Sequence, residues 1–414
     1  MRVSQLFTKT SKNAPSDEVA KNAQLLIRAG FIHKEMAGVY TYLPLGKRVL
    51  EKITHIIREE MNSVGGNEIS LTALQQKEPW VASGRWSDEV IDVWFKTKLA
   101  NGSELGLAPT HEEPLTKLMK NFISSYKDLP VYPYQFQIKF RNELRSKSGL
   151  MRGREFWMKD LYSFSKNQEE HDIFYEKASE AYDRIYARLG IGDITYKTFA
   201  SGGSFAKYSH EFQTLSEVGE DIIYVHEGRR LAINEEVYND EVLADLGIEK
   251  SELIEKKAVE VGNIFTLGTK FSDVLDLNYT DEDGQSKRVF MGSYGIGPSR
   301  LMGLLAEHFA DEKGLVWPAN IAPVQVYLVR IGSEMATSHA DELYDELTNQ
   351  GIEVLYDDRD ERPGTKFADA ELMGVPYRLT VSDRLIEANQ YEFTSRATGE
   401  TELLTRDQLL AKLN

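Results

Sequence analysis

The spacing of hydrophobic positions predicts α-helices at several places along the chain. Between residues 17 and 64, the stretches AKNAQLLIRAGFI and GKRVLEKITHIIREEMNSVG repeat apolar residues at the 3.6-residue period of a helix. We therefore expect 17–64 to be mainly helical. Further helices are predicted from Thr110 onwards, over 167–189 and over 299–309.

Alternating apolar and polar residues predict strands between those helices. A short strand is expected at 67–74, and a hairpin at 93–110, where an Asn-Gly pair separates two alternating runs. Two longer strands are expected at 134–144 and 155–164, and several strands with a helix or turn at 263–297. Because these strands lack strict βαβ alternation, the pattern favours a largely antiparallel sheet flanked by helices.

The pattern changes after the proline-containing stretch WPANIAP, at 317–323. The segments that follow, VQVYLVRIG, HADELYDELTNQG, IEVLYDD, TKFADAELMGV and YRLTVSD, alternate strand with helix. Such βαβαβ order predicts a small α/β domain with a parallel or mixed sheet. We place the boundary near Pro323, which divides an α+β chain into domains at 1–320 and 321–414.

Composition and charge narrow the class of protein. The 414 residues carry a formal net charge of -16, and 41% of them are hydrophobic. We find neither a run of 18 apolar residues nor an apolar signal core near the N-terminus, so we expect a cytoplasmic protein. The sequence has no cysteine, which excludes disulfides, thiolate metal sites and cysteine nucleophiles. So acidic a surface argues against nonspecific nucleic-acid binding, and any RNA contact must come from a few placed side chains.

Positive charge is nevertheless concentrated in FRNELRSKSGLMRGREFWMKD, at 140–160, which holds six Lys/Arg and three acids. Arg141 and Glu143 would share one face of a strand. A guanidinium there can bind a phosphate or carboxylate through two hydrogen bonds. The basic loop that follows, which includes Arg152, would cover a polyphosphate, and Phe156 would stack on a flat base. A solvated hairpin with surface ion pairs is the alternative.

Glycines lead into a predicted helix in MGSYGIGPSRLMGLLAEHF, at 291–309. Glycines let a backbone approach a ligand closely, and a helix N-terminus attracts anions. A dinucleotide fingerprint would need a third glycine where Arg300 stands. Arg300 instead adds a positive charge at the helix start, which fits a bound anion. The alternative is a tight turn followed by a surface arginine.

Two further stretches carry polar residues that suit a small-molecule pocket. In PTHEEP, either Thr110 caps a helix with Glu113 closing a capping box, or Thr110 and Glu112 bind a small ammonium group. In ASGGSFAKYSHEFQ, His210 has no second ligand at metal spacing, so we interpret it as a pocket wall.

Together these stretches resemble the bacterial-type prolyl-tRNA synthetases, a family of class II aminoacyl-tRNA synthetases. GVYTYLPLGKRVLEKITHIIREEM resembles the N-terminal helix segment of the family, and THEE resembles its amino-acid signature. FRNE…MRGREFWMKDLYSF resembles class II motif 2, and GSYGIGPSR resembles motif 3. LYDDRDERPGTKFADAELMGVPYRLTVSDR resembles the anticodon-binding domain shared with the threonyl, histidyl and glycyl enzymes. The resemblance runs along nearly the whole chain.

The resemblance implies roles for individual residues. The catalytic residues would be Arg141 and Arg300. The proline site would comprise Thr110, Glu112, Arg141, Phe156, Met158 and His210. The ATP site would comprise Arg141, Glu143, Arg152, Phe156, Gln213 and Arg300. In the acidic C-terminal domain, contacts to tRNA must come from a few side chains, and the candidates are Arg359, Arg362, Lys366 and Arg378, with a solvated surface as the alternative for each.

The resemblance also implies the reaction and its participants. L-proline would be activated by ATP to prolyl-adenylate and pyrophosphate, and proline would then pass to the 3′ end of tRNA(Pro). Because the attacking carboxylate is already ionised, no general base is needed, and positioning and charge neutralisation dominate. Mg²⁺ would be bound mainly by the phosphates, with no metal site in the protein itself. The family implies a homodimer and no membrane.

The chain departs from the family pattern at several points. Bacterial members usually carry a large editing domain where this chain has only residues 214–262. We therefore expect a form without that insert and weak rejection of alanine, since missing methylenes contribute about 1–3 kcal/mol. Thr72 replaces the motif 1 proline, Ser293 replaces the usual cysteine beside motif 3, and GGSFAKYSHEF is longer than the common form.

Three other functions are alternatives to this interpretation. A threonyl enzyme would need a zinc site with a cysteine ligand, which this sequence lacks, and a histidyl enzyme is a further relative with the same tail. A catalytically inactive synthetase paralogue that binds tRNA would be expected to lose Arg141, Glu143 or Arg300, and all three are present. A non-tRNA adenylating enzyme would have no use for the C-terminal domain.

Overall fold

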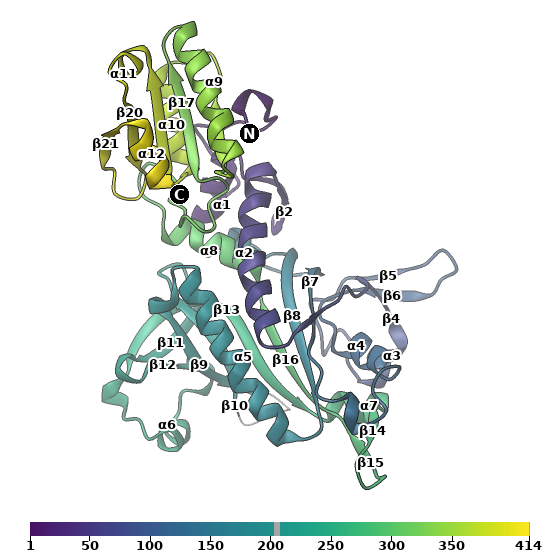
Figure 1. Ribbon diagram of the computed structural model, residues 1–414. Helices are drawn as coiled ribbons and strands as arrows, with labels where there is room; N and C mark the ends of the chain where they lie inside the picture. Colours follow the sequence, from purple (N-terminus) through teal and green to yellow (C-terminus); the bar gives the residue numbers. More distant parts are fainter. Residues whose placement is uncertain (203–207, 414) are drawn as a thin grey trace. The chain divides into compact units, whose positions relative to one another are not determined.

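The computed structural model describes residues 1–202 and 208–413. The chain forms two compact units, one of residues 1–53, 147–150 and 302–414, and the other of residues 54–146 and 151–301. Figure 1 shows the helices and strands of both units.

The described residues form α-helices and β-strands throughout both units. The helices are α1 (Lys21–Arg28), α2 (Pro44–Ser63), α3 (Lys77–Ala82), α4 (Glu112–Met119), α5 (Gln168–Arg188), α6 (Asp240–Leu246), α7 (Lys270–Leu275), α8 (Pro298–His308), α9 (Glu334–Asn349), α10 (Pro363–Met373), α11 (Asp383–Glu387) and α12 (Arg406–Leu413). The strands are β1 (Ile32–Met36), β2 (Val39–Tyr42), β3 (Asn67–Glu68), β4 (Leu74–Gln76), β5 (Lys96–Lys98), β6 (Glu104–Leu107), β7 (Pro133–Phe140), β8 (Glu155–Ser165), β9 (Thr195–Ser201), β10 (Tyr208–Leu215), β11 (Asp221–His226), β12 (Leu231–Asn234), β13 (Ile254–Gly268), β14 (Asn278–Thr280), β15 (Ser286–Arg288), β16 (Phe290–Ile296), β17 (Val326–Ile331), β18 (Val354–Asp357), β19 (Tyr377–Ser382), β20 (Tyr391–Ser395) and β21 (Thr401–Leu404).

The unit of residues 54–146 and 151–301 is built on a nine-stranded sheet. Its order is β10-β9-β12-β11-β13-β16-β8-β7-β3, and β10 also pairs with β13. All pairs are antiparallel except β9 with β12 and β3 with β7. Helix α5 packs against β8, β13 and β16, where Phe174 meets Tyr294 edge to face (Figure 1). The predicted antiparallel sheet flanked by helices is therefore confirmed.

Segment 214–262, where the resemblance to the family predicts that an editing domain is missing, folds compactly. Strand β13 pairs with both β10 and β11, β11 pairs with β12, β12 with β9, and β9 with β10. The five strands thus close into a ring. Buried side chains line it, namely Tyr196, Ile223, Val225, Ala232 and Ala258. A second small cluster lies beneath α6, with Ile233, Val242, Leu243 and Ile248.

Helices α4 and α7 cover a separate core beside the central strands. Leu115 and Phe271 from these helices pack with Phe164 of β8 and Met291 of β16. This core fixes the start of α4, where the predicted amino-acid site begins, against strands β8 and β16.

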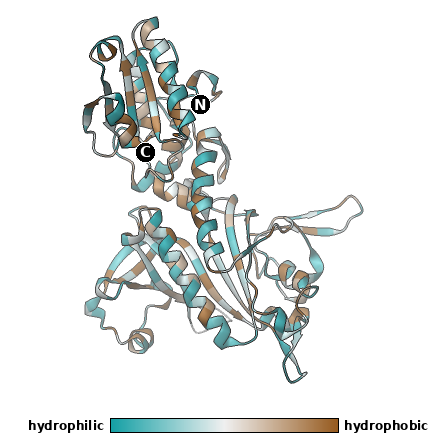
Figure 2. Cartoon of the chain, viewed as in Figure 1, coloured by the Kyte–Doolittle hydropathy of each residue, from teal (hydrophilic) through white to brown (hydrophobic). Residues whose placement is uncertain are grey.

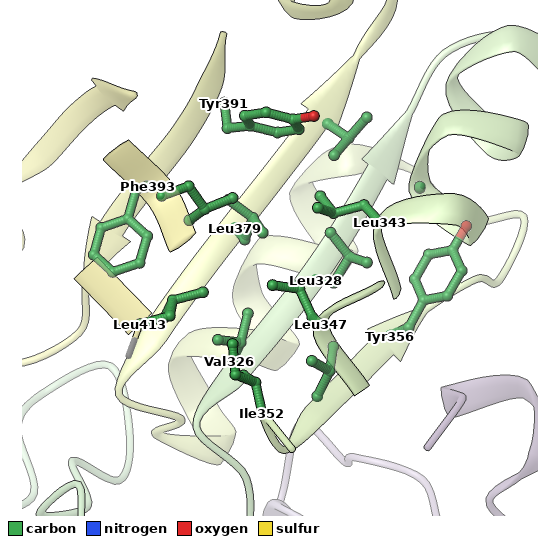
Figure 3. Close-up of a cluster of buried hydrophobic side chains, with 14 of the residues drawn as sticks. Val326, Leu328, Leu343, Leu347, Ile352, Tyr356, Leu379, Tyr391, Phe393 and Leu413 are labelled. Atoms are coloured by element: carbon green, nitrogen blue, oxygen red, sulfur yellow. The ribbon is translucent and has the colours of Figure 1, made fainter. Parts of the chain in front are cut away.

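The unit that contains the C-terminus holds a five-stranded mixed sheet of order β18-β17-β19-β20-β21. Strands β17, β18 and β19 are parallel, and β20 and β21 continue the sheet antiparallel. Figure 3 shows the core between the sheet and helices α9 and α12, with Leu328 of β17 near Leu343 and Leu347 of α9. Strand β17 is largely hydrophobic, whereas α9 carries polar residues along its length (Figure 2). The predicted βαβαβ order is confirmed, and β20, β21 and α12 were not predicted.

Residues 1–53 pack with the C-terminal residues of the same unit. The N-terminal amine donates to the carbonyl of Val354 at 2.8 Å, Arg2 forms an ion pair with Asp341 at 2.8 Å, and Thr10 donates to Asp369 at 2.6 Å. No local sequence pattern indicated these contacts, because the partners are more than 300 residues apart.

Two predictions of secondary structure were wrong in detail. Residues 17–64 are not helical throughout, because a hairpin of β1 and β2 separates α1 from α2. Gly30 and Gly38 flank and turn this hairpin with φ of 75° each, a conformation that glycine adopts without steric cost. The strand expected at 134–144 ends at Phe140, so Arg141 and Glu143 lie in a loop and share no strand face.

The predicted hairpin at 93–110 and the helices at 167–189 and 299–309 are present as β5–β6, α5 and α8. None of the helices in residues 1–202 and 208–413 combines the length and the apolar composition that crossing a membrane requires.

Candidate active site

Thr110 and Glu112 lie together where the chain passes from β6 into α4. The Thr110 hydroxyl lies 2.7 Å from both carboxylate oxygens of Glu112, to which it donates. The capping-box interpretation of this stretch was wrong, because His111 is the N-cap residue and makes no side-chain cap. Thr110 thus pairs with Glu112 and does not cap the helix, and Glu112 is only 8% exposed.

Glu113 is fully buried beside this pair and is held by residues that the sequence did not single out. Ser83 donates to its Oε1 at 2.7 Å, and Arg85 Nη1 lies 3.0 Å from the same oxygen. Burial raises the pKa of Glu113 to about 7, although the charge of Arg85 opposes this rise. Arg85 also lies 3.3 Å from Glu112, so one guanidinium contacts both carboxylates.

A buried polar network supports the Thr110–Glu112 pair from below. The Tyr162 hydroxyl accepts a hydrogen bond from the His111 backbone N–H at 3.1 Å and donates to Glu112 at 3.3 Å. Lys139 forms an ion pair with Asp160 at 2.8 Å and contacts His111 Nδ1. Burial, aided by Lys139, lowers the pKa of His111 to about 4. A neutral His111 then donates through Nε2 to the backbone carbonyl of Thr72, 3.0 Å away. Thr72, which replaces the motif 1 proline of the family, is thus connected to the start of α4.

Arg141 lies at the base of the loop after β7. Its backbone N–H donates to the carbonyl of Arg154, and its Nη2 donates at 3.4 Å to the carbonyl of Pro109, the residue before Thr110. The guanidinium lies over the ring of Phe156, 5.3 Å from its centroid. The structure therefore brings Arg141, Phe156 and the start of the Thr110–Glu112 pair together.

Glu143 follows Arg141 in a tight turn. Its backbone N–H donates to the Arg141 carbonyl at 2.8 Å, and its own carbonyl accepts from Arg154 Nε at 3.0 Å. Arg154 thus ties both residues to the start of β8, a role that the sequence did not reveal.

Met158 lies on β8 opposite Gln137 of β7. Gly295 of β16 lies beside it, and a Cβ placed on Gly295 would be 2.6 Å from Met158 Cε. This glycine is needed for a side chain of the protein itself, whereas the sequence suggested that it admits a ligand. Ser293, on the same strand, is in register with Tyr162.

Arg300 lies in the first turn of α8, as predicted. Its Nε donates to the carbonyl of Met151 at 2.9 Å, and its Nη1 donates to the carbonyl of Glu260 at 2.6 Å and to the Glu260 carboxylate at 3.1 Å. Burial lowers the pKa of Arg141, and the charge of Arg300 lowers it further. Two guanidiniums that repel each other in this way form a site suited to an anion.

His210 and Gln213 both lie on β10 but have different surroundings. His210 Nδ1 pairs with the hydroxyl of Tyr175 at 2.7 Å, and burial lowers the pKa of His210 to about 3, which suits an uncharged pocket wall. Gln213 is fully buried, and its amide donates to Glu211 at 2.8 Å and to Asp221 at 3.0 Å. Residues 203–207 of the lengthened GGSFAKYSHEF stretch lie outside the described residues.

Glu211 of β10 and Glu260 of β13 lie on paired strands, where Glu211 is in register with Asn263 and Glu260 with Gln213. Burial raises the pKa of Glu211 to about 7, and the charge of Glu260 adds to this rise. Asn234 donates to Glu211 at 3.1 Å, and Asn263 donates to Glu260 at 2.8 Å. Residues 1–202 and 208–413 contain no group of three His, Cys, Asp or Glu side chains that could hold a metal ion.

Arg152 is exposed and forms an ion pair with Glu220 at 3.0 Å. Both side chains are about half exposed, so the pair is weak and Arg152 can change partner at little cost.

The four residues predicted to contact tRNA differ in accessibility. Lys366 is only 1% exposed and donates to the carbonyls of Arg330 and Asp357, so its prediction as an RNA contact is corrected. Arg359 is bound by Asp357 and Asp369, each at 2.7 Å, and Arg378 lies over the ring of Phe367 at 4.3 Å. Arg362 is exposed at the N-terminus of α10.

Two family models and several curated proteins match this chain. Residues 95–309 match the family model of the tRNA synthetase class II core domain (G, H, P, S and T), and residues 325–414 match that of the anticodon binding domain. The chain is 36% identical over 439 residues to a proline–tRNA ligase of Agrobacterium fabrum, which covers 100% of this chain and 99% of the relative. It is 35% identical to a proline–tRNA ligase of a Geobacillus species over 561 residues, which covers 99% of this chain and 98% of that relative.

The fold is also similar to a solved structure. The prolyl-tRNA synthetase of Cryptosporidium parvum, in complex with halofuginone and AMPPNP, superposes with a TM-score of 0.78 at 19% identity. The match covers 94% of this chain and 75% of that chain.

Proposed function

The chain belongs to the proline–tRNA ligase family of class II aminoacyl-tRNA synthetases, and we propose that it activates L-proline with ATP and transfers it to the 3′ end of tRNA(Pro). The observation that carries this proposal is the placement of Arg141. Its guanidinium donates to the residue before Thr110 and covers the ring of Phe156, so an ammonium-binding pair and an aromatic surface meet at one cation.

In the proposed proline site, Thr110 and Glu112 bind the imino nitrogen. The Glu112 carboxylate accepts hydrogen bonds from a secondary ammonium, and charge-assisted bonds of this kind are stronger than neutral ones. Met158 and the neutral His210 supply apolar and uncharged walls for the ring, together with Phe156. Arg141 binds the carboxylate that attacks.

In the proposed ATP site, Arg141 and Arg300 neutralise the phosphates. Arg141 bridges the carboxylate of proline and the α-phosphate, and Arg300 approaches from the side of α8. Phe156 stacks on adenine, and Glu143 accepts a hydrogen bond from the adenine amino group. Arg152 leaves its ion pair with Glu220 and binds the outer phosphates of ATP. Gln213 is buried, so its influence on ATP passes through Glu211.

The reaction needs no protein nucleophile. The carboxylate of proline attacks the α-phosphorus, the bond to the bridging oxygen breaks, and pyrophosphate leaves. The two arginines stabilise charge that develops on the phosphoryl oxygens, and fixed positioning of both substrates supplies much of the rate.

We also propose Mg²⁺, bound mainly by the phosphates. The phosphate oxygens of ATP are the hard oxygen ligands that Mg²⁺ prefers. Bound there, the ion would neutralise phosphate charge.

We propose that residues 1–320 carry the reaction and residues 321–414 bind the anticodon, with residues 1–53 also packed on the C-terminal sheet. Arg362 is the accessible candidate for RNA contact, whereas Arg359 and Arg378 first have to leave their present partners. A cytoplasmic homodimer is the proposed form of the protein, on the resemblance to the family.

This chain is shorter than some members of its family. The alignment with the Geobacillus relative extends over 561 positions, whereas this chain has 414 residues, so that relative holds more than a hundred residues without a counterpart here. We propose that they correspond to an editing domain at 214–262 and that this chain rejects alanine weakly.

The test is exchange of labelled pyrophosphate into ATP, with proline, alanine and no amino acid compared. We expect strong exchange with proline, a smaller signal with alanine, and loss of exchange in Arg141→Ala. Arg58→Ala is the matched control, because Arg58 also lies over an aromatic ring, but its ring is Phe136 and its ion-pair partner is Glu68. No proline-dependent exchange from folded protein that binds ATP would favour the inactive tRNA-binding paralogue instead.

A further inference from the structure

Two adjacent carboxylates enter the amino-acid site, although a single ammonium group is to be bound there. Glu112 and Glu113 are 8% and 0% exposed. Two buried carboxylates this close cannot both be charged without compensation, because each opposes ionisation of the other. A proton held by Glu112 would remove the charge that attracts an ammonium ligand.

Arg85 is the cation that contacts both carboxylates. Its Nη1 lies 3.3 Å from Glu112 Oε2, 3.0 Å from Glu113 Oε1 and 3.2 Å from Glu113 Oε2. Burial alone would lower the pKa of Arg85, but the two carboxylates raise it, so the guanidinium remains charged. The closer and more numerous contacts are with Glu113, which leaves Glu112 able to accept from Thr110 and a ligand.

The orientation of Arg85 is fixed by aromatic rings and by the neighbouring helix. The guanidinium lies 5.1 Å from the ring centroid of Trp80 in α3 and 5.5 Å from that of Phe271 in α7. Ser83, two residues before Arg85, donates to Glu113 and so ties the same turn to α4. Arg85 is thus held against one side of the carboxylates, with 22% of its side chain exposed.

We infer that Arg85 is a positioning residue that balances the charge of Glu113 and thereby keeps Glu112 oriented for the imino nitrogen of proline. The inference rests on the proposed function and adds to it a residue outside the sequence motifs. Arg85 itself needs no contact with proline, ATP or the reacting atoms.

The first experiment measures KM for proline and for ATP separately in pyrophosphate exchange at pH 8, above the pKa of about 7 of Glu113, so that this carboxyl is ionised in the wild type. Arg85→Gln is compared with Arg58→Gln as the matched control. We expect Arg85→Gln to raise KM for proline about tenfold or more, equivalent to about 1.4 kcal/mol, with KM for ATP within twofold of the wild type. Arg58→Gln should match the wild type. A KM for proline within twofold of the wild type in Arg85→Gln, or an equal rise in both KM values, would overturn the inference.

The second experiment separates charge balance from packing. In the double variant Arg85→Gln/Glu113→Gln the second negative charge is gone, so we expect KM for proline to fall at least threefold below that of Arg85→Gln. A double variant no better than the single one would show that Arg85 acts through packing alone and would overturn the charge argument.

Arg85→Lys keeps the inference testable if Arg85→Gln does not fold. Lysine retains the charge but lacks the planar fork that contacts two carboxylates, so we expect an intermediate KM for proline and an unchanged KM for ATP. A wild-type KM for proline in Arg85→Lys, with Arg85→Gln unfolded, would count against a positioning role. If the wild-type protein shows no proline-dependent exchange, the proposed function fails, whereas exchange that is insensitive to Arg85 removes only this inference.

Discussion

At the scale of single residues, sequence motifs identify side chains that would meet ligands but miss those that hold them. Thr110, Glu112, Arg141 and Arg300 stand in short recognisable stretches, and the structure brings them into one unit. Arg85 and Tyr162, which contact Glu112, are 27 and 50 positions away from it. Such contacts arise from tertiary packing, so the local periodicity of the sequence and the spacing of its motifs do not predict them.

Gly295 gives a prediction at this scale. A methyl group at this position would lie 2.6 Å from Met158 Cε and 2.8 Å from Asn263 Oδ1. We expect Gly295→Ala to displace Met158, raise KM for proline severalfold and destabilise the fold by about 1–3 kcal/mol, as overpacking does. Thermal unfolding and proline-dependent exchange measure the two effects.

Gly364→Ala is the control for this substitution, because no heavy atom lies within 4 Å of a Cβ there. It should leave both quantities nearly unchanged. The double variant Gly295→Ala/Met158→Ala should regain stability without regaining affinity for proline. If the double variant is as unstable as Gly295→Ala, the clash with Met158 is not the cause.

At the scale of secondary-structure elements, periodicity predicts long helices and strands well and short hairpins poorly. The 21 residues of α5 and the 11 of β8 were predicted nearly to their ends. The hairpin of β1 and β2 was missed, because the apolar residues of FIHKEMAGVYTYL fit both a helical and an alternating pattern over so short a stretch. The ring of β9 to β13 could not be predicted from local patterns either, because these patterns do not say which strands pair with each other.

The ring gives a prediction at this scale. Ile223 on β11 is fully buried in the ring core, whereas the adjacent Ile222 points to the other face and is partly exposed. Ile223→Ala should cost about 2–5 kcal/mol of local stability, and Ile222→Ala should cost much less. Hydrogen exchange of β11 and β12 should accelerate in Ile223→Ala, with β7 and β8 unaffected. Equal effects of the two substitutions would contradict the assignment of faces.

At the scale of the whole molecule, buried titratable groups set how stability depends on pH. Burial lowers the pKa of His111 and His171 to about 4, and burial with Lys197 lowers that of His210 to about 3. Each contributes stability above the unfolded pKa of about 6.5, and this stability is lost as pH falls through the folded value. Glu113 and Glu211, whose pKa is raised to about 7, have the opposite effect. Their contribution to the stability of the fold is present below about pH 4.5 and is lost as pH rises to about 7.

We therefore expect the free energy of unfolding to be greatest near pH 6.5 and to fall most steeply below about pH 4.5, where the histidines act without the opposing acids. Denaturant titrations across this range measure the curve. His171→Gln keeps a donor for Thr266 but does not titrate, so it should flatten the acid side by up to about 3 kcal/mol. An unchanged acid slope in this variant would show that His171 is not neutral in the folded protein.

The closed ring has a consequence for how this family changes in size. Leu215 at the end of β10 and Ala258 on β13 are paired neighbours, and the chain between them forms β11 and β12, which complete the ring with β9 and β13. The two ends of the intervening segment therefore lie side by side, and they meet β13 on the edge opposite to β16. A much longer module could be grafted there, or the present one exchanged for another, without altering the spacing of β8, β16 and β13. Gain and loss of a whole domain at this point would then require no compensating change in the residues that bind proline and ATP.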